Sequence, residues 1–141
     1  MFTGEYNHTI DKKGRMIIPN KFRAYLGESF VVTKGLDNCL EIYDKDTWTT
    51  FEEKINALPY SNPDAREFKR LFIGKKIDLV PDKLGRVQLT IPLRDFVGLK
   101  EDVTFVGVGN HIEVWDTETY KSLNNFSDST ELSRKMEGLG I

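Results

Sequence analysis

The sequence contains one five-residue pattern twice, and this repetition limits the fold more than any other feature. Asp11-Lys12-Lys13-Gly14-Arg15 returns 71 residues later as Asp82-Lys83-Leu84-Gly85-Arg86, and the two copies stay in register as far as Gly27 and Gly98. A repeat at a fixed spacing indicates one structural unit used twice. Each unit of about fifty residues would be marginally stable alone, so we expect the two units to share one core.

The residues around each copy predict a hairpin, made of a strand, a tight turn and a returning strand. In the first copy an aspartate can accept backbone N–H groups where the turn begins, and a glycine supplies the positive φ angle that closes it. The hairpin tip then displays Lys12 and Lys13 to solvent. The residues predicted to form the two turns are Asp11, Gly14, Asp82 and Gly85.

Apolar periodicity and capping residues predict the other elements. Strands are predicted at residues 5–10, 15–18, 30–33, 40–43, 103–108 and 112–115. Helices are predicted at 19–27, from Asp46 to Leu58, at 64–72 with Asn62 as N-cap and Pro63 at the first position, after Thr90 as N-cap, around Tyr120 and Leu123, and within 127–141. The chain is thus predicted to divide into a first repeat (5–48), a helical connection (49–75), a second repeat (76–120) and a C-terminal helical tail (121–141).

Cysteine content, hydropathy and charge limit the class of protein. The lone Cys39 cannot form an internal disulfide and is best explained as a buried apolar residue. No apolar run approaches membrane-spanning length and no signal peptide is apparent, so we expect a soluble cytoplasmic protein without a membrane partner. The net charge is −2, but residues 1–36 carry six basic and three acidic residues, whereas residues 95–141 carry four and nine. The first copy of the motif therefore lies at the basic end.

No set of residues predicts catalysis. His8 and His111 do not occupy matching positions in the two repeats, and the motifs of zinc proteases, serine hydrolases and phosphate-binding loops are absent. Gly107-Val108-Gly109 is better explained as a hairpin turn than as part of a phosphate site. We therefore expect no enzyme activity, metal, cofactor or small-molecule substrate.

A strand, a D-x-x-G-R turn, a returning strand and a short helix that contains Phe22-Arg23 or Leu93-Arg94 together resemble the SpoVT/AbrB swapped-hairpin DNA-binding unit. Two such units in one chain, joined by the segment Asp64–Arg70, resemble the MraZ family in particular. The resemblance covers nearly the whole chain. It implies an α+β, mainly β fold, in which the two repeats form one double-ψ-like swapped-hairpin β-barrel with short helices outside. It also implies a ring-shaped homo-oligomer.

The function implied by the resemblance is transcriptional regulation in bacteria. Members of the family resemble one another in binding short G-rich direct repeats, about one DNA turn apart, in double-stranded promoter DNA. The resemblance implies that the promoter is that of the regulator's own cell-division and cell-wall operon. It places the protein in the cytoplasm, associated with the nucleoid.

Basic residues of the first repeat form the predicted DNA-binding site. Arg15 is the candidate for recognising guanine through its planar guanidinium group, while the others position the DNA backbone. The predicted contacts of the first repeat are Lys12, Lys13, Arg15, Lys21 and Arg23, and weaker candidates from the second repeat are Lys83, Arg86 and Arg94. The second repeat is less basic, with Leu84 opposite Lys13 and Thr90 where the family usually has proline, so we expect the first repeat to recognise DNA.

Two questions stay open at this point. Arg15 and Arg86 can instead form ion pairs with Asp11 and Asp82 that clamp each turn. The whole protein can instead be an oligomeric protein-interaction scaffold without specific DNA binding, an alternative favoured by its net negative charge. Antidote-type regulators with AbrB-like units are a third possibility, but they usually carry one unit and a toxin-binding tail.

Overall fold

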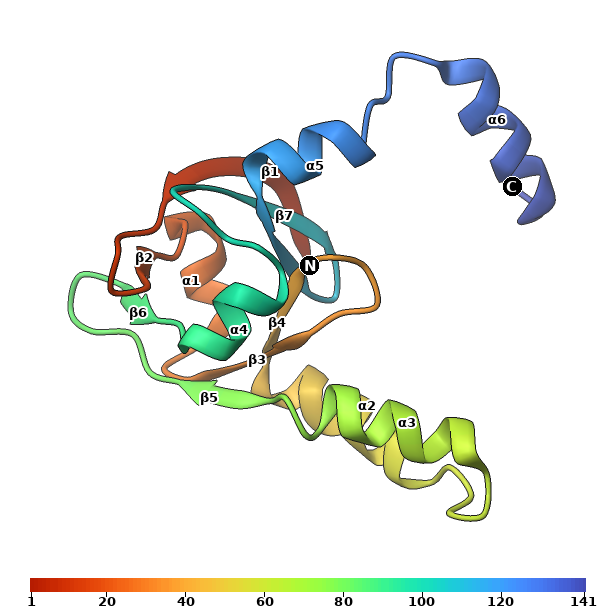
Figure 1. Ribbon diagram of the computed structural model, residues 1–141, viewed down its shortest axis with the longest axis horizontal. Helices are drawn as coiled ribbons and strands as arrows, with labels where there is room; N and C mark the ends of the chain where they lie inside the picture. The colour runs from red at the N-terminus through yellow and green to blue at the C-terminus, as the bar shows by residue number, and fades with distance from the viewer.

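The computed structural model describes all 141 residues and shows an α+β protein that is mainly β (Figure 1). The strands are β1 (Phe2–Thr9), β2 (Arg15–Ile17), β3 (Phe30–Lys34), β4 (Leu40–Asp44), β5 (Ile77–Leu79), β6 (Arg86–Gln88), β7 (Asp102–Gly109) and β8 (Ile112–Asp116). The helices are α1 (Asn20–Leu26), α2 (Lys45–Asn56), α3 (Pro63–Phe72), α4 (Ile91–Phe96), α5 (Thr117–Leu123) and α6 (Ser129–Gly138).

Both repeats contribute strands to both sheets. A six-stranded antiparallel sheet has the order β1-β7-β8-β4-β3-β5, and β2 pairs with β6 in a separate two-stranded ribbon. Strand β1 of the first repeat lies along the whole of β7, and β5 of the second repeat lies against β3. The two repeats are therefore interleaved, and neither has a complete sheet of its own.

The predicted hairpins are wrong in their strand pairing. Strands β1 and β2 flank the first turn but do not pair with each other, because each pairs with a strand of the second repeat. The Ile10 N–H donates to the Glu101 carbonyl at 2.8 Å, which keeps the chain beside β7 until the turn begins. After the turn, the Ile18 N–H donates to the Gly85 carbonyl at 3.1 Å and keeps the chain beside β6.

The expected closed barrel is also wrong. The large sheet has two free edges, β1 and β5, and the β2–β6 ribbon forms a ladder of its own. Strands β2, β5 and β6 are three residues long, and β2 and β6 pair only with each other, so no ladder joins the ribbon to β1 or β5. The ribbon instead closes one face of the sheet through side-chain packing.

A single core of 18 buried residues lies between the sheet and a layer formed by α1, α4 and the ribbon. Alternate sheet residues such as Phe30, Ile42 and Phe105 meet Phe22 of α1 and Leu93 of α4 there. Burying each such side chain contributes roughly 1.5–3 kcal/mol. Because both repeats supply these residues, the expectation of one shared core is confirmed.

The opposite face of the sheet is covered in two separate places. Helices α2 and α3 pack side by side over Val31 and Tyr43, and α5 packs over Cys39 and Trp115 (Figure 1). Cys39 is buried, as predicted. Helix α6 buries none of its residues and lies away from the sheet in Figure 1.

Most predicted helix ends agree with the structure. The Asn62 and Thr90 side chains accept N-cap hydrogen bonds, and Pro63 occupies the first turn of α3. Leu58 was expected in the second helix, but α2 ends at Asn56. None of the helices is both long and apolar enough to cross a membrane.

The turn predicted at Gly107-Val108-Gly109 is wrong, because all three residues belong to β7. Gly107 lies opposite Gly4 of β1, and a Cβ atom on it would lie 2.4 Å from the Thr3 backbone nitrogen. The glycine therefore allows the close approach of two strands.

Candidate nucleic-acid interface

The β2–β6 ribbon presents two rows of side chains, one to the core and one to solvent. Its pairs are Arg15 with Gln88, Met16 with Val87, and Ile17 with Arg86. The middle pair is buried in the core, and the other four residues are exposed. In Figure 1 the ribbon lies on the side of the molecule away from α2, α3 and α6. The ribbon is therefore an open surface that displays one arginine from each repeat.

Each motif folds into a turn closed by its aspartate. The Asp11 Oδ1 atom accepts from the backbone N–H groups of Lys13 and Arg15, both at 2.9 Å, and the Gly14 N–H donates to the Asp11 carbonyl at 3.0 Å. Gly14 has a φ angle of 83°. The second turn repeats these bonds around Asp82, and Gly85 has a φ angle of 78°. Both turns therefore have the same internal hydrogen bonds.

The arginine that ends each motif pairs with the aspartate that begins it. Arg15 Nε donates to Asp11 Oδ2 at 2.7 Å, and Arg86 Nε donates to Asp82 Oδ2 at the same distance. The backbone N–H of the arginine, followed by its side chain, lowers the pKa of Asp11 and of Asp82. The Nη1 and Nη2 atoms of both arginines make no hydrogen bond within the chain. Each arginine is thus oriented through one nitrogen and keeps its two terminal amino groups free.

Two further arginines cross from one repeat to the turn of the other. Arg94 lies against Gly14, where an added Cβ atom would lie 2.6 Å from Arg94 Nε, and Arg94 Nη1 donates to the Lys12 carbonyl at 3.2 Å. Arg23 lies against Gly85, where an added Cβ atom would lie 2.5 Å from Arg23 Cζ. Arg23 therefore lies beside the second turn, although the sequence suggested a place beside the first.

The basic residues named from the sequence thus form two groups joined by the ribbon. Lys12, Lys13, Arg15 and Arg94 surround the first turn, and Lys83, Arg86 and Arg23 surround the second. Lys21 is exposed on α1, near Ile17. The acidic residues within the two turns, Asp11 and Asp82, are both paired with arginine. The surface therefore carries a strong positive charge, although the whole chain is slightly negative.

The exposed face of the ribbon also contains Gln88 and Ile17, which were not among the residues predicted from the sequence. Gln88 lies opposite Arg15 on the ribbon, and its Nε2 atom donates to the Lys13 carbonyl at 2.8 Å. The alternation of Arg86-Val87-Gln88 could have placed Gln88 on the exposed face. Arg86 matches Arg15 in the sequence repeat, and the pairing of β2 with β6 places both arginines on the same exposed face of the ribbon.

One group of side chains has the spacing of metal ligands, and it lies elsewhere. Glu41, His111 and Glu113 are on the face of the sheet that α2, α3 and α5 partly cover. The ribbon packs against the opposite face, so this group takes no part in the basic surface.

Comparison with known proteins gives one consistent family. The family model described as "MraZ protein, putative antitoxin-like" matches residues 1–71 and 73–137. The chain is 44% identical to the proteins named Transcriptional regulator MraZ of Clostridium tetani and of Acetivibrio thermocellus, over the whole length of each chain. It is 46% identical to the protein of that name from Carboxydothermus hydrogenoformans, over 96% of both chains.

Proposed function

Because the chain belongs to the MraZ family of transcriptional regulators, we propose that it binds double-stranded DNA through the β2–β6 ribbon and its two flanking turns. The observation that carries this proposal is the pair of exposed arginines, Arg15 and Arg86, each fixed by an aspartate and each with free Nη atoms. The target is a set of short G-rich direct repeats in the promoter of its own cell-division and cell-wall operon.

A two-stranded β-ribbon fits the major groove of B-DNA. In that groove an arginine can donate two hydrogen bonds to O6 and N7 of one guanine, a contact that distinguishes guanine from other bases by about 1–3 kcal/mol. The aspartate pairs hold the Nε side of Arg15 and Arg86, so the planar groups are oriented before DNA arrives. Gln88 and Ile17, on the same exposed face, are the next candidates for base contacts.

The lysines have a different role in this proposal. Lys12, Lys13 and Lys83 are exposed at the two turns, at the ends of the ribbon, where they can reach phosphates on either side of the groove. Contacts to phosphates position the protein but carry no sequence information. Such a surface alone binds DNA non-specifically, with Kd values of roughly 10⁻⁴ to 10⁻⁶ M at physiological salt.

Specific binding then requires several ribbons to act together. We propose a ring-shaped homo-oligomer whose ribbons meet direct repeats about 10 to 10.5 base pairs apart. Linking the binding events raises the overall affinity by roughly 10² to 10⁴. Phe68, Leu36 and Leu58 form an exposed apolar surface around α2 and α3 that supports self-association. The cytoplasm and nucleoid are the corresponding location.

Footprinting on the DNA upstream of the protein's own gene tests this function. We expect protection of evenly spaced G-rich elements, and a loss of affinity when any one element is removed. Affinity should also fall steeply with salt concentration. Equal binding to the native and scrambled fragments would contradict specific regulation. Absence of DNA binding by a well-folded oligomer would favour the alternative, a protein-interaction scaffold.

A further inference from the structure

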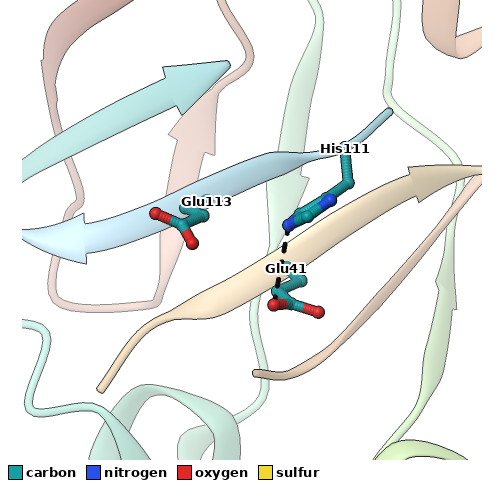
Figure 2. A group of neighbouring side chains, drawn as sticks. All are labelled: Glu41, His111 and Glu113. Carbon is teal, nitrogen blue, oxygen red and sulfur yellow. Dashed lines mark ion pairs between the residues drawn. The ribbon is translucent and has the colours of Figure 1, made fainter. Parts of the chain in front are cut away.

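Two glutamates and one histidine meet on the outer face of the large sheet, between the area covered by α2 and α3 and the area covered by α5. Glu41 is on β4, Glu113 is on β8, and His111 immediately precedes β8. Figure 2 shows the imidazole ring of His111 directed toward Glu41, with Glu113 on the same face. One ligand atom from each of the three residues lies within 4.8 Å of the others.

The two carboxylates are an unfavourable pair as they stand. Glu41 and Glu113 are direct partners in the antiparallel register of β4 and β8, and like charges in this position destabilise a sheet. Only 13% of the Glu41 side chain is exposed, so water screens its charge poorly. Neither glutamate forms an ion pair with lysine or arginine, and Lys34 on neighbouring β3 donates to the carbonyl groups of Gly35 and Asp37. The one group at the site that can carry a positive charge is His111, whose Nε2 atom lies 3.6 Å from Glu41 Oε2 and forms an ion pair with it only when the ring is protonated (Figure 2).

Each of the three side chains makes one hydrogen bond to a neighbouring residue, and each has a second possible ligand atom that makes no hydrogen bond. The Tyr43 hydroxyl donates to Glu41 Oε1 at 2.7 Å, and Trp115 Nε1 donates to Glu113 Oε1 at 3.0 Å. His111 Nδ1 lies 2.7 Å from the Asn110 Oδ1 atom, which can only accept, so Nδ1 carries the proton. In the neutral ring, Nε2 then has a free lone pair, and this buried atom makes no hydrogen bond.

This pattern is typical of metal ligands in proteins. A ligating histidine usually donates its other ring N–H to an oxygen atom, and ligating carboxylates are themselves hydrogen-bonded. The His111 ring also stacks on Tyr43, with centroids 4.9 Å apart and an interplanar angle of 19°, which fixes its orientation. Gly35 leaves space for Glu41, because a Cβ atom at that position would lie 2.7 Å from Glu41 Oε2.

We propose that Glu41 Oε2, Glu113 Oε2 and His111 Nε2 bind one divalent transition-metal ion of the zinc class. Imidazole selects such ions over Mg²⁺ and Ca²⁺, which prefer oxygen ligands alone. Zinc ligands lie about 2.0–2.2 Å from the ion, so the two carboxylates rotate inward on binding. Three protein ligands leave a fourth position for water or another donor.

The ion would connect the two repeats at the centre of the sheet. Glu41 comes from the first repeat and the other two ligands come from the second, while β4 and β8 are inner strands of the sheet. The sequence predicted no metal because His8 and His111 do not occupy matching positions in the two repeats and Glu41 lies 70 residues before His111. The site is separate from the ribbon, so metal binding adds to the proposed DNA-binding function and does not depend on it.

Titration of the untagged full-length protein with Zn²⁺ after chelation tests the site, with Co²⁺ absorption as a direct signal of coordination. We expect one Zn²⁺ per chain, a rise in Tm on binding, and no comparable effect of Mg²⁺. His111→Gln should weaken Zn²⁺ binding by about 100-fold or more. His8→Gln is the matched control, because His8 contacts the Ile17 carbonyl and Phe105 and should leave the affinity unchanged.

The Glu113→Gln variant distinguishes a metal-binding role of Glu113 from a purely structural one. It removes one of two facing negative charges, so the metal-free variant should melt at the same temperature as the wild type or higher, and should no longer gain stability from Zn²⁺. A lower Tm without metal would indicate a structural role and overturn the proposal. Zn²⁺ binding that is equal in the wild type, His111→Gln and Glu113→Gln, or absent at millimolar Zn²⁺, would also overturn it.

Discussion

The two D-x-x-G-R turns have the same internal bonds but different support from the rest of the molecule. The first turn receives two side-chain donors from the second repeat, Gln88 to the Lys13 carbonyl and Arg94 to the Lys12 carbonyl. In the first repeat, Ile17 matches Gln88 and has no side-chain donor. Arg23 matches Arg94, and its Nη1 atom donates to Asn20 of its own helix. The turn with more positive charge is therefore the turn that accepts two side-chain hydrogen bonds from the opposite repeat. Local residues determine the shape of each turn, and the opposite repeat determines how many further contacts it makes.

The arginines allow the most direct comparison of the two turns. Arg15→Ala and Arg86→Ala should each weaken binding to the proposed G-rich promoter fragment by roughly 5- to 150-fold, since each removes one proposed guanine contact worth about 1–3 kcal/mol. Fluorescence anisotropy with native and scrambled DNA measures the loss.

Arg15→Lys and Arg86→Lys are the controls for this pair, because lysine keeps the charge but not the planar group. Both lysine variants should retain non-specific DNA binding and lose the difference in affinity between native and scrambled DNA. If only the Arg15 variants lose affinity, the first repeat alone recognises DNA, as the sequence suggested. If either alanine variant unfolds or its oligomer dissociates, the arginine acts mainly as a clamp on its turn.

The glycines test how closely each turn contacts the other repeat. Gly14→Ala and Gly85→Ala both force a side chain into a left-handed backbone conformation, which costs about 1–2 kcal/mol. At Gly14 the new Cβ atom would also lie 2.6 Å from the Leu89 carbonyl oxygen, whereas at Gly85 it meets the flexible end of Arg23. Urea unfolding should therefore show a larger loss of free energy for Gly14→Ala. Equal losses would mean that the ribbon shifts to relieve the backbone contact.

The same difference between local and long-range structure explains how much could be predicted from the sequence. The turns, the N-caps at Asn62 and Thr90, and the buried Cys39 depend on neighbouring residues or on composition, and the sequence indicated each of them. Strand pairing across the D-x-x-G-R turns was predicted wrongly because β1 and β2 are adjacent in sequence, yet each forms its ladder with a strand of the other repeat.

The candidate DNA-binding site shows the same difference between local and long-range structure. Its basic residues could be named from the sequence, but their grouping could not. Arg23 lies against the turn at Gly85, and Arg94 lies against the turn at Gly14, because the repeats are interleaved. The sequence repeat makes Arg86 equivalent to Arg15, but their place on one exposed face depends on the β2–β6 register, which no local pattern specifies.

Lys13 and Leu84 test whether both turns approach phosphates. They occupy matching positions at the two tips, and both are exposed. Lys13→Leu should reduce the slope of log K against log salt by about 0.9, the value for one lost phosphate contact. Leu84→Lys should increase the slope by the same amount if the second turn lies as close to DNA as the first. An unchanged slope for Leu84→Lys would show that only the first turn touches the backbone.

The smallest expected effect concerns acid stability, and here the two turns should behave alike. The pKa values of Asp11 and Asp82 are lowered by the same partners, the backbone and side chain of Arg15 and of Arg86 respectively. A carboxylate whose pKa is lower in the folded state stabilises the protein above its unfolded pKa of about 3.9, and this contribution is lost as the pH falls through the folded value. Asp11→Asn and Asp82→Asn should therefore each reduce the loss of unfolding free energy below about pH 4 by the same small amount, measured by urea unfolding between pH 3 and pH 6. A larger change for Asp11→Asn would mean that Gln88 and Arg94 strengthen the carboxylate pair of the first turn as well as its backbone, so that support from the opposite repeat would extend to its electrostatics.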